Sequence, residues 1–425
     1  MFGWEFPPHI AGGLGTACKG IVEGLAHNGV ETIFVMPSAS GDEDQSCTTI
    51  INASDVAVRN VSSTVDEFLD KVKFIHVDSN IVPYVEPEEY FEAIEKMKRE
   101  QRTETTVGFG QKFKFSGKYG ANLLEEVSRY AQVGGTIAMQ HSSEFDVIHA
   151  HDWLTYLAGI AAKELTGKPL VVHVHATSFD RGTDDMVDSR VFAIEKRGME
   201  AADKVVAVSE LTRNIVINKY GISPDKVVAV HNAVDFSGRE NLDVERGVKD
   251  KVVTFLGRIT FQKGPEYFID AAAKVLKRTP NVRFVMAGSG DMMNRAIRQV
   301  ARLGIADRFH FTGFLRGGEV QKMFALSDVY IMPSVSEPFG ISPLEAMRSN
   351  VPSIISNQSG AAEVLKYAFK VDFWDVDAMA DDIYALLNYP ALSEFAAAQG
   401  LEEVNALKWD HATAKLKKVY ESVIK

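Results

Sequence analysis

The chain of 425 residues contains only two cysteines, Cys18 and Cys47. They lie far apart and show no metal-ligand spacing, which excludes a disulfide scaffold and a cysteine-based zinc site. We interpret them as reduced thiols, and expect the protein to be cytoplasmic.

The sequence also lacks long hydrophobic runs. No apolar stretch approaches the ~18 residues that a helix needs to span a bilayer. The first residues, "MFGWEFPPHIAGG", have no basic segment followed by an apolar core, so we predict neither a signal peptide nor a transmembrane segment. Only "MFGWEF" precedes a Gly-rich turn, so the first strand is either very short or incomplete.

Positive charge is in deficit, with 46 Lys and Arg against 57 Asp and Glu, for a net charge of −11. This balance argues against nucleic acid as a partner, because broad binding to nucleic acid needs a basic surface. A local basic pocket remains compatible with it. The length exceeds one ordinary core, so we expect two or three domains.

Short apolar runs alternate with helical patterns along most of the chain. This alternation is typical of βαβ units and a parallel sheet. Helices are predicted at 16–29 and 155–167, and each ends at a glycine. The predicted buried strands of the first half are 31–37, 146–151, 169–176, 204–209 and 226–235.

The pattern restarts after a polar segment at 236–251. Helices are predicted at 265–279 and 292–304. The strands of the second half are predicted at 252–258, 282–290, 308–314, 329–334 and 351–357. We therefore predict an α/β fold with two Rossmann-like, doubly wound domains, residues 1–240 and 241–425, whose strand ends face a ligand cleft.

Residues 41–135 break this rhythm and are interpreted as an insertion in the first domain. It contains a charged helical segment, "EEYFEAIEKMKREQRTE", and the stretch "GFGQKFKFSGKYG" at 108–120. Aromatic residues alternating with lysines can stack on nucleobases or sugars. The pattern favours an amphipathic surface element.

The stretch "PPHIAGGLG" at 7–15 is a Gly-rich turn that leads from a strand into a helix. Gly12, Gly13 and Gly15 allow close approach to a ligand, and the helix N-terminus favours a phosphate. The spacing is not the dinucleotide fingerprint. A simple tight turn remains the alternative.

The stretch "GRITFQKG" at 257–264 places Arg258 and Lys263 just after the first strand of the second half. A guanidinium and an ammonium at the carboxyl end of a strand suit a diphosphate. They would stabilise the negative charge that grows on a leaving group. A solvated basic loop is the alternative.

In "HAHDW" at 149–153, His149 and His151 alternate at a strand end. A metal site would need further ligands, and we find no second set, so we predict no metal. We expect His151 to bind a polar ligand, while His149 can be a core histidine. The neighbouring strand end "HVHATSFDR" at 173–181 should bring further polar side chains to the same cleft.

In "SEPFGISPLEAM" at 336–347, two carboxylates flank a turn. Pro338 and Gly340 shape a loop that presents the amides of Phe339, Gly340 and Ile341. Glu345 lies in a helix, where it can accept hydrogen bonds from two vicinal hydroxyls, as a ribose presents. Glu337 can contact sugar hydroxyls or a cationic transition state. Two solvated surface carboxylates would not explain the turn between them.

Together these segments resemble the retaining GT-B glycosyltransferases, in particular the glycogen- and starch-synthase-like members of families 4 and 5. The resemblance covers nearly the whole chain. It rests on "GGLG", "HAHDW", "SELTRN…YG", "VHNAVD", "GRITFQKG", "AGSG", "TGF" and "EPFGISPLEAM". It implies a GT-B fold whose last helix, near 408–425, packs back on the first domain.

The resemblance also implies roles for individual residues. Arg258 and Lys263 would neutralise the leaving diphosphate without a metal, Glu337 would hold the transferred sugar, and His151 would contact its O6. The remaining residues would bind the donor, an ADP- or UDP-hexose: Gly12, Gly13, Ser289, Phe314, Leu315, Phe339, Gly340, Ile341 and Glu345. The acceptor would be a glucan or another glycan, and no other cofactor is implied.

Two features depart from the family pattern. Where classical synthases carry a Lys-x-Gly-Gly turn, this chain reads His9 to Gly13, so a lysine near the donor phosphate is missing. The insertion at 41–135 has no counterpart that we can match. Donor base and acceptor therefore stay open. A transferase acting on a lipid or small glycan and an inactive sugar-nucleotide-binding protein are the alternatives.

Overall fold

A computed structural model gives the fold of the chain. The structure describes residues 1–9, 13–59, 65, 67, 68, 110–120, 122–182, 187–234, 244, 247, 249–315 and 318–424. The chain divides into two compact units. Unit 1 comprises Met1–Ala233 and Trp409–Lys425, and unit 2 comprises Val234–Lys408. The sequence analysis placed this boundary at residue 240.

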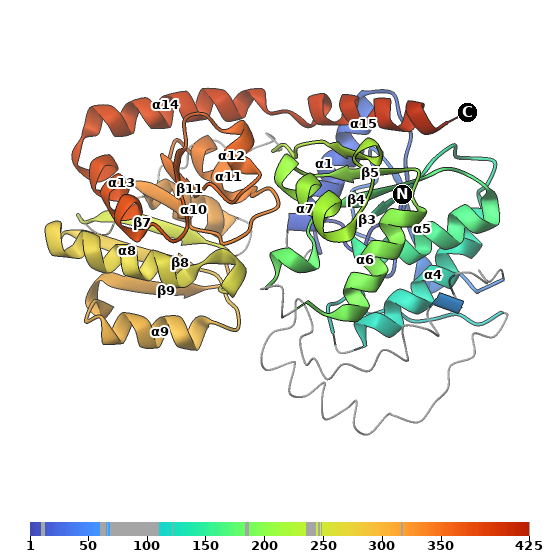
Figure 1. Ribbon diagram of the computed structural model, residues 1–425, viewed down its shortest axis with the longest axis horizontal. Helices are drawn as coiled ribbons and strands as arrows, with labels where there is room; N and C mark the ends of the chain where they lie inside the picture. Colours follow the sequence, from blue (N-terminus) through green and yellow to red (C-terminus); the bar gives the residue numbers. More distant parts are fainter. Residues whose placement is uncertain are drawn as a thin grey trace, which may run out of the picture. The chain divides into compact units, whose positions relative to one another are not determined.

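Unit 1 contains a parallel sheet with helices on both faces (Figure 1). Its strands and helices are α1 (Gly13–His27), β1 (Ile33–Met36), β2 (Thr49–Asn52), α4 (Leu123–Gln140), β3 (Ile148–His151), α5 (Trp153–Thr166), β4 (Leu170–Val174), α6 (Ser189–Ala201), β5 (Lys204–Ala207), α7 (Glu210–Tyr220), β6 (Val227–Ala229) and α15 (Trp409–Val423).

The first residues of the chain lie inside this sheet. Phe2 is bridged in parallel to Val35 of β1 and to Ala150 of β3. Its N–H donates to His149 O at 2.7 Å, and the His151 N–H donates to Phe2 O at 3.0 Å. The strand order is therefore β2-β1, residues 1–3, then β3-β4-β5-β6.

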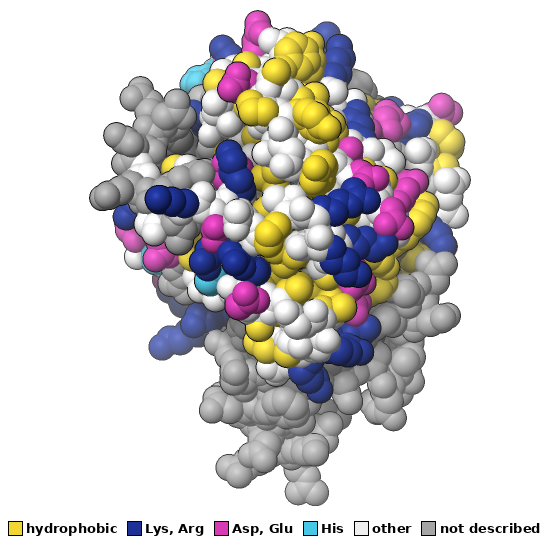
Figure 2. Space-filling model, turned by 90° about the vertical axis from the view of Figure 1, so that its left-hand side faces the viewer, with side chains coloured by type: hydrophobic (Ala, Val, Ile, Leu, Met, Phe, Trp, Pro, Cys, Tyr) yellow, Lys and Arg dark blue, Asp and Glu magenta, His cyan; other side chains and the backbone are white. Residues whose placement is uncertain are grey.

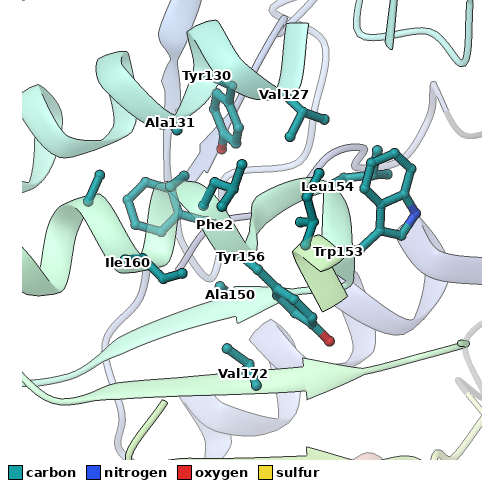
Figure 3. Packing of buried hydrophobic residues seen from close by; sticks show 14 of the residues in the cluster. Phe2, Val127, Tyr130, Ala131, Ala150, Trp153, Leu154, Tyr156, Ile160 and Val172 are labelled. Atoms are coloured by element: carbon teal, nitrogen blue, oxygen red, sulfur yellow. The ribbon is translucent and has the colours of Figure 1, made fainter. Parts of the chain in front are cut away.

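The two faces of this sheet have separate hydrophobic cores. Helices α4, α5 and α6 cover one face, where Phe2, Tyr130 and Trp153 are buried (Figure 3). Helices α1 and α15 cover the other face, and Trp409 and Tyr420 of α15 pack there with apolar residues of β4 and β5. The last helix is thus part of the core of unit 1.

Unit 2 is a six-stranded parallel sheet in the order β12-β11-β10-β7-β8-β9. Its elements are β7 (Lys251–Leu256), α8 (Pro265–Arg278), β8 (Val282–Ala287), α9 (Met293–Arg302), β9 (Phe309–Gly313), α10 (Gly318–Leu326), β10 (Val329–Met332), α11 (Ser342–Arg348), β11 (Ser353–Ser356), α12 (Ala361–Val364), β12 (Phe369–Val371), α13 (Val376–Asn388) and α14 (Pro390–Ala406).

Successive side chains along the strands of unit 2 point to opposite faces of the sheet, so both faces receive apolar side chains. Val329 and Ile331 of β10 lie in the core with α8, α9 and α13, whereas Tyr330 points to the opposite face and stacks edge-on against Phe324 of α10. The α/β fold with two Rossmann-like sheets is confirmed.

The predicted insertion at 41–135 is partly core. Residues 60–64, 66, 69–109 and 121, with the predicted charged helix, lie outside the described residues. In the stretch from Lys112 to Tyr119, Phe113, Phe115 and Tyr119 are buried in the core of unit 1, while Lys112, Lys114 and Lys118 are exposed. The aromatic rings therefore do not form a surface for stacking bases or sugars.

The surface in Figure 2 carries charges of both signs. Lys and Arg side chains alternate with Asp and Glu around a band of hydrophobic side chains. Among the described residues on this face, the basic side chains form no continuous surface. Among the helices that the structure describes, none is long and apolar enough to cross a bilayer.

Candidate active site

The candidate site in unit 2 lies at the carboxyl edge of its sheet. Counted along the chain, β7 is the first strand of this unit and β10 the fourth, and the two are neighbours in the sheet. The strand order reverses its direction between them. Ligands of open α/β sheets bind at such a switch point, beyond the carboxyl ends of the strands.

The loop after β7 carries both predicted cations. Arg258 donates to Gln262 Oε1 at 3.4 Å, and the short helix η5 (Phe261–Lys263) ends at Lys263. The methylene chain of Lys263 lies next to Gly257: a Cβ built at Gly257 would be 3.8 Å from it. Arg258 and Lys263 thus extend from the same short loop.

This loop is fixed against the loop after β10. The Val335 N–H donates to Gln262 O at 2.9 Å. Gly264 has φ 64°, and a Cβ there would lie 2.1 Å from Pro333 O, so only glycine permits this approach. The Lys263 ammonium forms an ion pair with the Glu337 carboxylate, which joins the two loops at the switch point.

Glu337 is held on several sides. Its N–H donates to Gln358 O and its carbonyl accepts from the Gly360 N–H, both at 2.9 Å. The Ser334 hydroxyl donates to Glu337 Oε2 at 3.3 Å. Only 6% of Glu337 is exposed. Its backbone is therefore fixed, and its carboxylate faces Lys263.

Gly340 and Glu345 follow on the same loop and helix. Gly340 has φ 96°, in the region that favours glycine, and a Cβ there would lie 3.1 Å from side-chain atoms of both Glu337 and Met332. Glu345 lies in the first turn of α11, which begins with Ser342 and Pro343. Phe339 is buried, so its side chain belongs to the core.

Tyr330 of β10 contacts the helix that carries Glu345, and the sequence analysis did not identify it. Its hydroxyl donates to Ser342 Oγ at 2.8 Å. Burial raises the pKa of Tyr330, and the carboxylates of Glu337 and Glu345 raise this pKa further. Because Ser342 begins α11, this hydrogen bond joins β10 to the helix that carries Glu345.

Ser289, Phe314 and Leu315 follow the neighbouring strands β8 and β9. The Ile259 N–H donates to Ser289 O at 2.8 Å, so the β8 loop packs on the loop that carries Arg258. The Gly288 N–H donates to Gly313 O at 2.9 Å, which joins the β8 loop to the end of β9. Phe314 is 55% exposed and Leu315 is partly buried.

In unit 1, Gly13 is exposed at the start of α1, and Gly12 lies outside the described residues. The Gly15 N–H donates to the buried carboxylate of Glu5 at 3.0 Å. One amide of the predicted phosphate loop is therefore occupied by a protein carboxylate. Sequence patterns did not suggest this contact.

His151 is fully buried and belongs to a cluster of four histidines. Its Nδ1 lies 3.0 Å from His175 Nε2, and His149 Nδ1 lies 2.7 Å from the Tyr420 hydroxyl. The β3–β4 register pairs His151 with His173, so all four rings extend from one face of the sheet. Burial lowers the pKa of each histidine, that of His175 to about 3.

The other polar residues of the β3 and β4 ends bind one another. Arg181 lies 3.7 Å from Asp152 and 3.3 Å from Glu195. Burial raises the pKa of Asp152 to about 7, although Arg181 opposes this shift. Asp180 accepts from the backbone and hydroxyl of Thr177. These side chains fix the loop after β4.

The structure thus brings most of the predicted residues to one edge of one sheet: Arg258, Lys263, Ser289, Phe314, Leu315, Glu337, Phe339, Gly340, Ile341 and Glu345. Gly13 and His151 belong to unit 1. Gln262 and Tyr330, which hold this edge together, were missed because neither residue type indicates a site.

Two family models match the chain. The family described as "Glycosyl transferases group 1" matches residues 239–400, and "Glycosyltransferase Family 4" matches residues 115–237. The first match lies in unit 2, and the second lies almost entirely in unit 1 and begins at residue 115.

Several proteins named as glycosyltransferases or glycogen synthases are similar in sequence to this chain. An uncharacterized glycosyltransferase of Methanocaldococcus jannaschii is 28% identical, over 99% of this chain and 97% of its own. D-inositol 3-phosphate glycosyltransferase of Nocardioides is 26% identical, over 72% of this chain and 74% of its own. Glycogen synthase of Mycobacterium tuberculosis is 22% identical, over 99% of this chain and 93% of its own.

The fold resembles that of solved structures. Sucrose-phosphate synthase of Thermosynechococcus elongatus has a TM-score of 0.68 to this chain at 17% identity, and the match covers 97% of this chain and 93% of that one. At this identity the likeness concerns the fold alone.

Proposed function

Since the chain belongs to the GT-B glycosyltransferases, we propose that it is a retaining hexosyltransferase acting on a nucleotide-diphosphate sugar. The transferred group would be glucosyl, and the acceptor the non-reducing end of an α-1,4-glucan. The observation that carries this proposal is the Lys263–Glu337 pair at the switch point, with Arg258 on the same loop.

Arg258 and Lys263 would bind the diphosphate. An ammonium has three N–H donors, so Lys263 can donate to Glu337 and still donate to phosphate oxygens. A guanidinium offers a planar pair of donors. As the bond from the anomeric carbon to the phosphate oxygen breaks, both cations would stabilise the charge on the diphosphate. We propose that they perform this task without a divalent metal.

Retention would follow from attack on the face that the diphosphate leaves. The acceptor oxygen forms a bond to an oxocarbenium-like anomeric carbon, and its proton passes to an oxygen of the leaving diphosphate. Glu337 would contact the sugar hydroxyls and stabilise the positive charge at that centre. Its low exposure and fixed backbone suit a positioning task.

The remaining residues would bind the ends of the donor. Glu345 would accept hydrogen bonds from the two ribose hydroxyls. Phe314 and Leu315 would lie by the base, with Ser289 and the amides at 339–341 near the phosphates and sugar. From unit 1, the amide of Gly13 and its neighbour Gly12 would contact a phosphate, and His151 the sugar O6.

A second candidate function is transfer to a small phosphorylated or lipid-linked acceptor. The Nocardioides relative is named for D-inositol 3-phosphate, and it is 26% identical over 72% of this chain, against 22% over 99% for the glycogen synthase. A lipid acceptor finds less support, because the aromatics of the stretch 112–119 are buried in unit 1.

The test pairs donors with acceptors. The purified chain is incubated with radiolabelled ADP-glucose, UDP-glucose or GDP-mannose, each with glycogen, D-inositol 3-phosphate or lipid extract. We expect label from a glucose donor in glycogen. Label in inositol phosphate or lipid would replace the proposed acceptor, and an absence of transfer with every pair would contradict the proposed activity.

A further inference from the structure

The histidine cluster of unit 1 contains more unsatisfied polar atoms than a packed core ordinarily holds. Among the buried side-chain atoms that have no hydrogen-bond partner are Nε2 of His149, Nε2 of His151, and both ring nitrogens of His173. Buried polar groups in native proteins are bonded to protein, to water or to an ion. Each group left alone would cost stability.

The nitrogens of three of these rings lie near enough to one another to hold a cation. One ring nitrogen from each of His149, His151 and His173 lies within 4.8 Å of those of the other two. Three imidazoles around tetrahedral zinc, with bonds of ~2.0–2.1 Å, would have nitrogens about 3.4 Å apart. The His173 ring stacks on the rings of His149 and His151 at interplanar angles of 19° and 25°, so the rings must rotate before their nitrogens converge on one ion.

The surroundings of the cluster suit ligation. The Nδ1 atoms of His149 and His151 lie within hydrogen-bond distance of the Tyr420 hydroxyl and of His175 Nε2. In the tautomer with the proton on Nδ1, each ring donates this bond and keeps the lone pair of Nε2 for a metal. Ligating histidines typically have such an outer partner.

We propose that His149, His151 and His173 form a transition-metal site that takes Zn²⁺, with a fourth position left for water. Imidazole ligands favour zinc and its neighbours over magnesium or calcium. A pocket whose lining includes Phe145, His149 and Tyr420 borders the cluster at His149. The site lies wholly within unit 1.

The test measures metal directly. Untagged full-length protein is stripped with a chelator, incubated with Zn²⁺ or Co²⁺, desalted and analysed for metal content and for the visible absorption of tetrahedral Co²⁺. We expect one ion per chain, with Zn²⁺ displacing Co²⁺ and raising the unfolding temperature. Wild-type protein that holds no stoichiometric ion would overturn the site and leave water as the partner of these nitrogens.

Matched variants locate the ion. His173→Phe and His149→Phe keep ring volume and remove the nitrogens, so each should abolish stoichiometric binding. His27→Ala, at an exposed histidine paired with Asp410, should bind as the wild type does. Binding retained in a correctly folded His173→Phe or His149→Phe protein would contradict the assignment, and either variant alone suffices for this test.

One consequence rests on the proposed function. Nε2 of His151 cannot bind zinc and a sugar hydroxyl together, so one equivalent of Zn²⁺ should slow transfer at least tenfold. His173→Phe, which touches no proposed substrate, should remove this inhibition. If the wild type binds zinc without inhibition, the proposed contact of His151 with the sugar is wrong while the metal site stands.

Discussion

Lys263 and Glu337 form an ion pair between the loops that follow β7 and β10. The pair is mostly buried, with 20% of the Lys263 side chain and 8% of the Glu337 side chain exposed, so salt screens it less than a surface pair. A donor that binds here would exchange part of this pairing for contacts with diphosphate and sugar. The pair therefore keeps both groups oriented at the point where we place the reaction.

Glu345 should determine affinity for the donor ribose. A hydrogen bond to a charged group is worth about 1.5–3 kcal/mol, and Glu345→Gln should lose much of it. We expect the KM for the donor to rise tenfold or more, with a smaller change in kcat. Steady-state kinetics measure both. Glu266→Gln, in the first turn of α8, is the control, and an equal rise there would refute the ribose contact.

Gly264 should be indispensable for the contact between the two loops. A Cβ would lie 2.1 Å from Pro333 O, and the φ of 64° costs another residue about 1–3 kcal/mol. Gly304 has a similar φ of 69° and no atom within 4 Å of its Cβ position. Gly264→Ala should thus lower the unfolding temperature more than Gly304→Ala does. Equal losses would show that the close approach carries no cost.

At the scale of elements, every strand predicted from periodicity exists in the structure, because buried parallel strands are continuous apolar runs. Strands β2 and β12 were missed. They are short and lie at sheet edges, where half-exposed residues weaken the pattern. The alternating lysines and aromatic residues from Lys112 to Tyr119 were interpreted as a surface element. A two-residue period is also that of an extended segment that buries one side, which is what the structure shows.

Helix α13 contains a carboxyl group that should respond to pH. Partial burial, with help from Asp381 and Asp375, raises the pKa of Asp382 to about 6. The folded state therefore binds the Asp382 proton more tightly than the unfolded state does. Its contribution to stability is complete below the unfolded pKa of 3.8 and is lost as the pH rises through about 6. Asp382→Asn should therefore raise the unfolding temperature at pH 7 and leave it unchanged near pH 3.5.

Calorimetry at the two pH values checks this expectation. Asp377→Asn, at an exposed residue of the same helix paired with Lys274, serves as the control and should give no gain at either pH. A gain from Asp382→Asn of the same size at pH 3.5 would mean that charge is not its cause.

At the scale of the whole molecule, the last helix belongs to the core of unit 1, although unit 2 precedes it in the chain. The Trp409 ring packs against Gly20 of α1, where a Cβ would lie 2.2 Å from it. The sequence predicted this packing only through the family resemblance. Composition and periodicity identify a helix at the end of the chain, but they do not say which unit it contacts.

Removal of the Trp409 side chain should destabilise unit 1. Trp→Ala in a core typically costs about 3–5 kcal/mol, because a cavity remains. We expect Trp409→Ala to lower the unfolding temperature of unit 1 by several degrees, as calorimetry would measure. Trp374, 57% exposed in unit 2, is the control. A comparable loss from Trp374→Ala would contradict a specific role for the α1–α15 contact.

The sequence was most informative about residues that follow strands, because parallel strands bring their carboxyl ends to one edge. This rule led to the predictions for Arg258, Lys263 and Glu337, which follow β7 and β10 in the structure. His173 was not identified as a partner of His149 and His151, since only the register of β3 with β4 shows that these rings share a face. In both "HAHDW" and "HVHA" a histidine occurs at every second residue, and this shared spacing is the signal that could have identified His173.

The most direct test of the central claim is the turnover of Lys263→Ala and Arg258→Ala. Losing one group that stabilises charge in a transition state typically costs about 3 kcal/mol. We predict that each variant, folded as the wild type by circular dichroism, transfers sugar at least a hundredfold more slowly, whereas Lys274→Ala transfers it normally. Near-normal rates in either of the first two variants would contradict the claim that these cations stabilise the departing diphosphate.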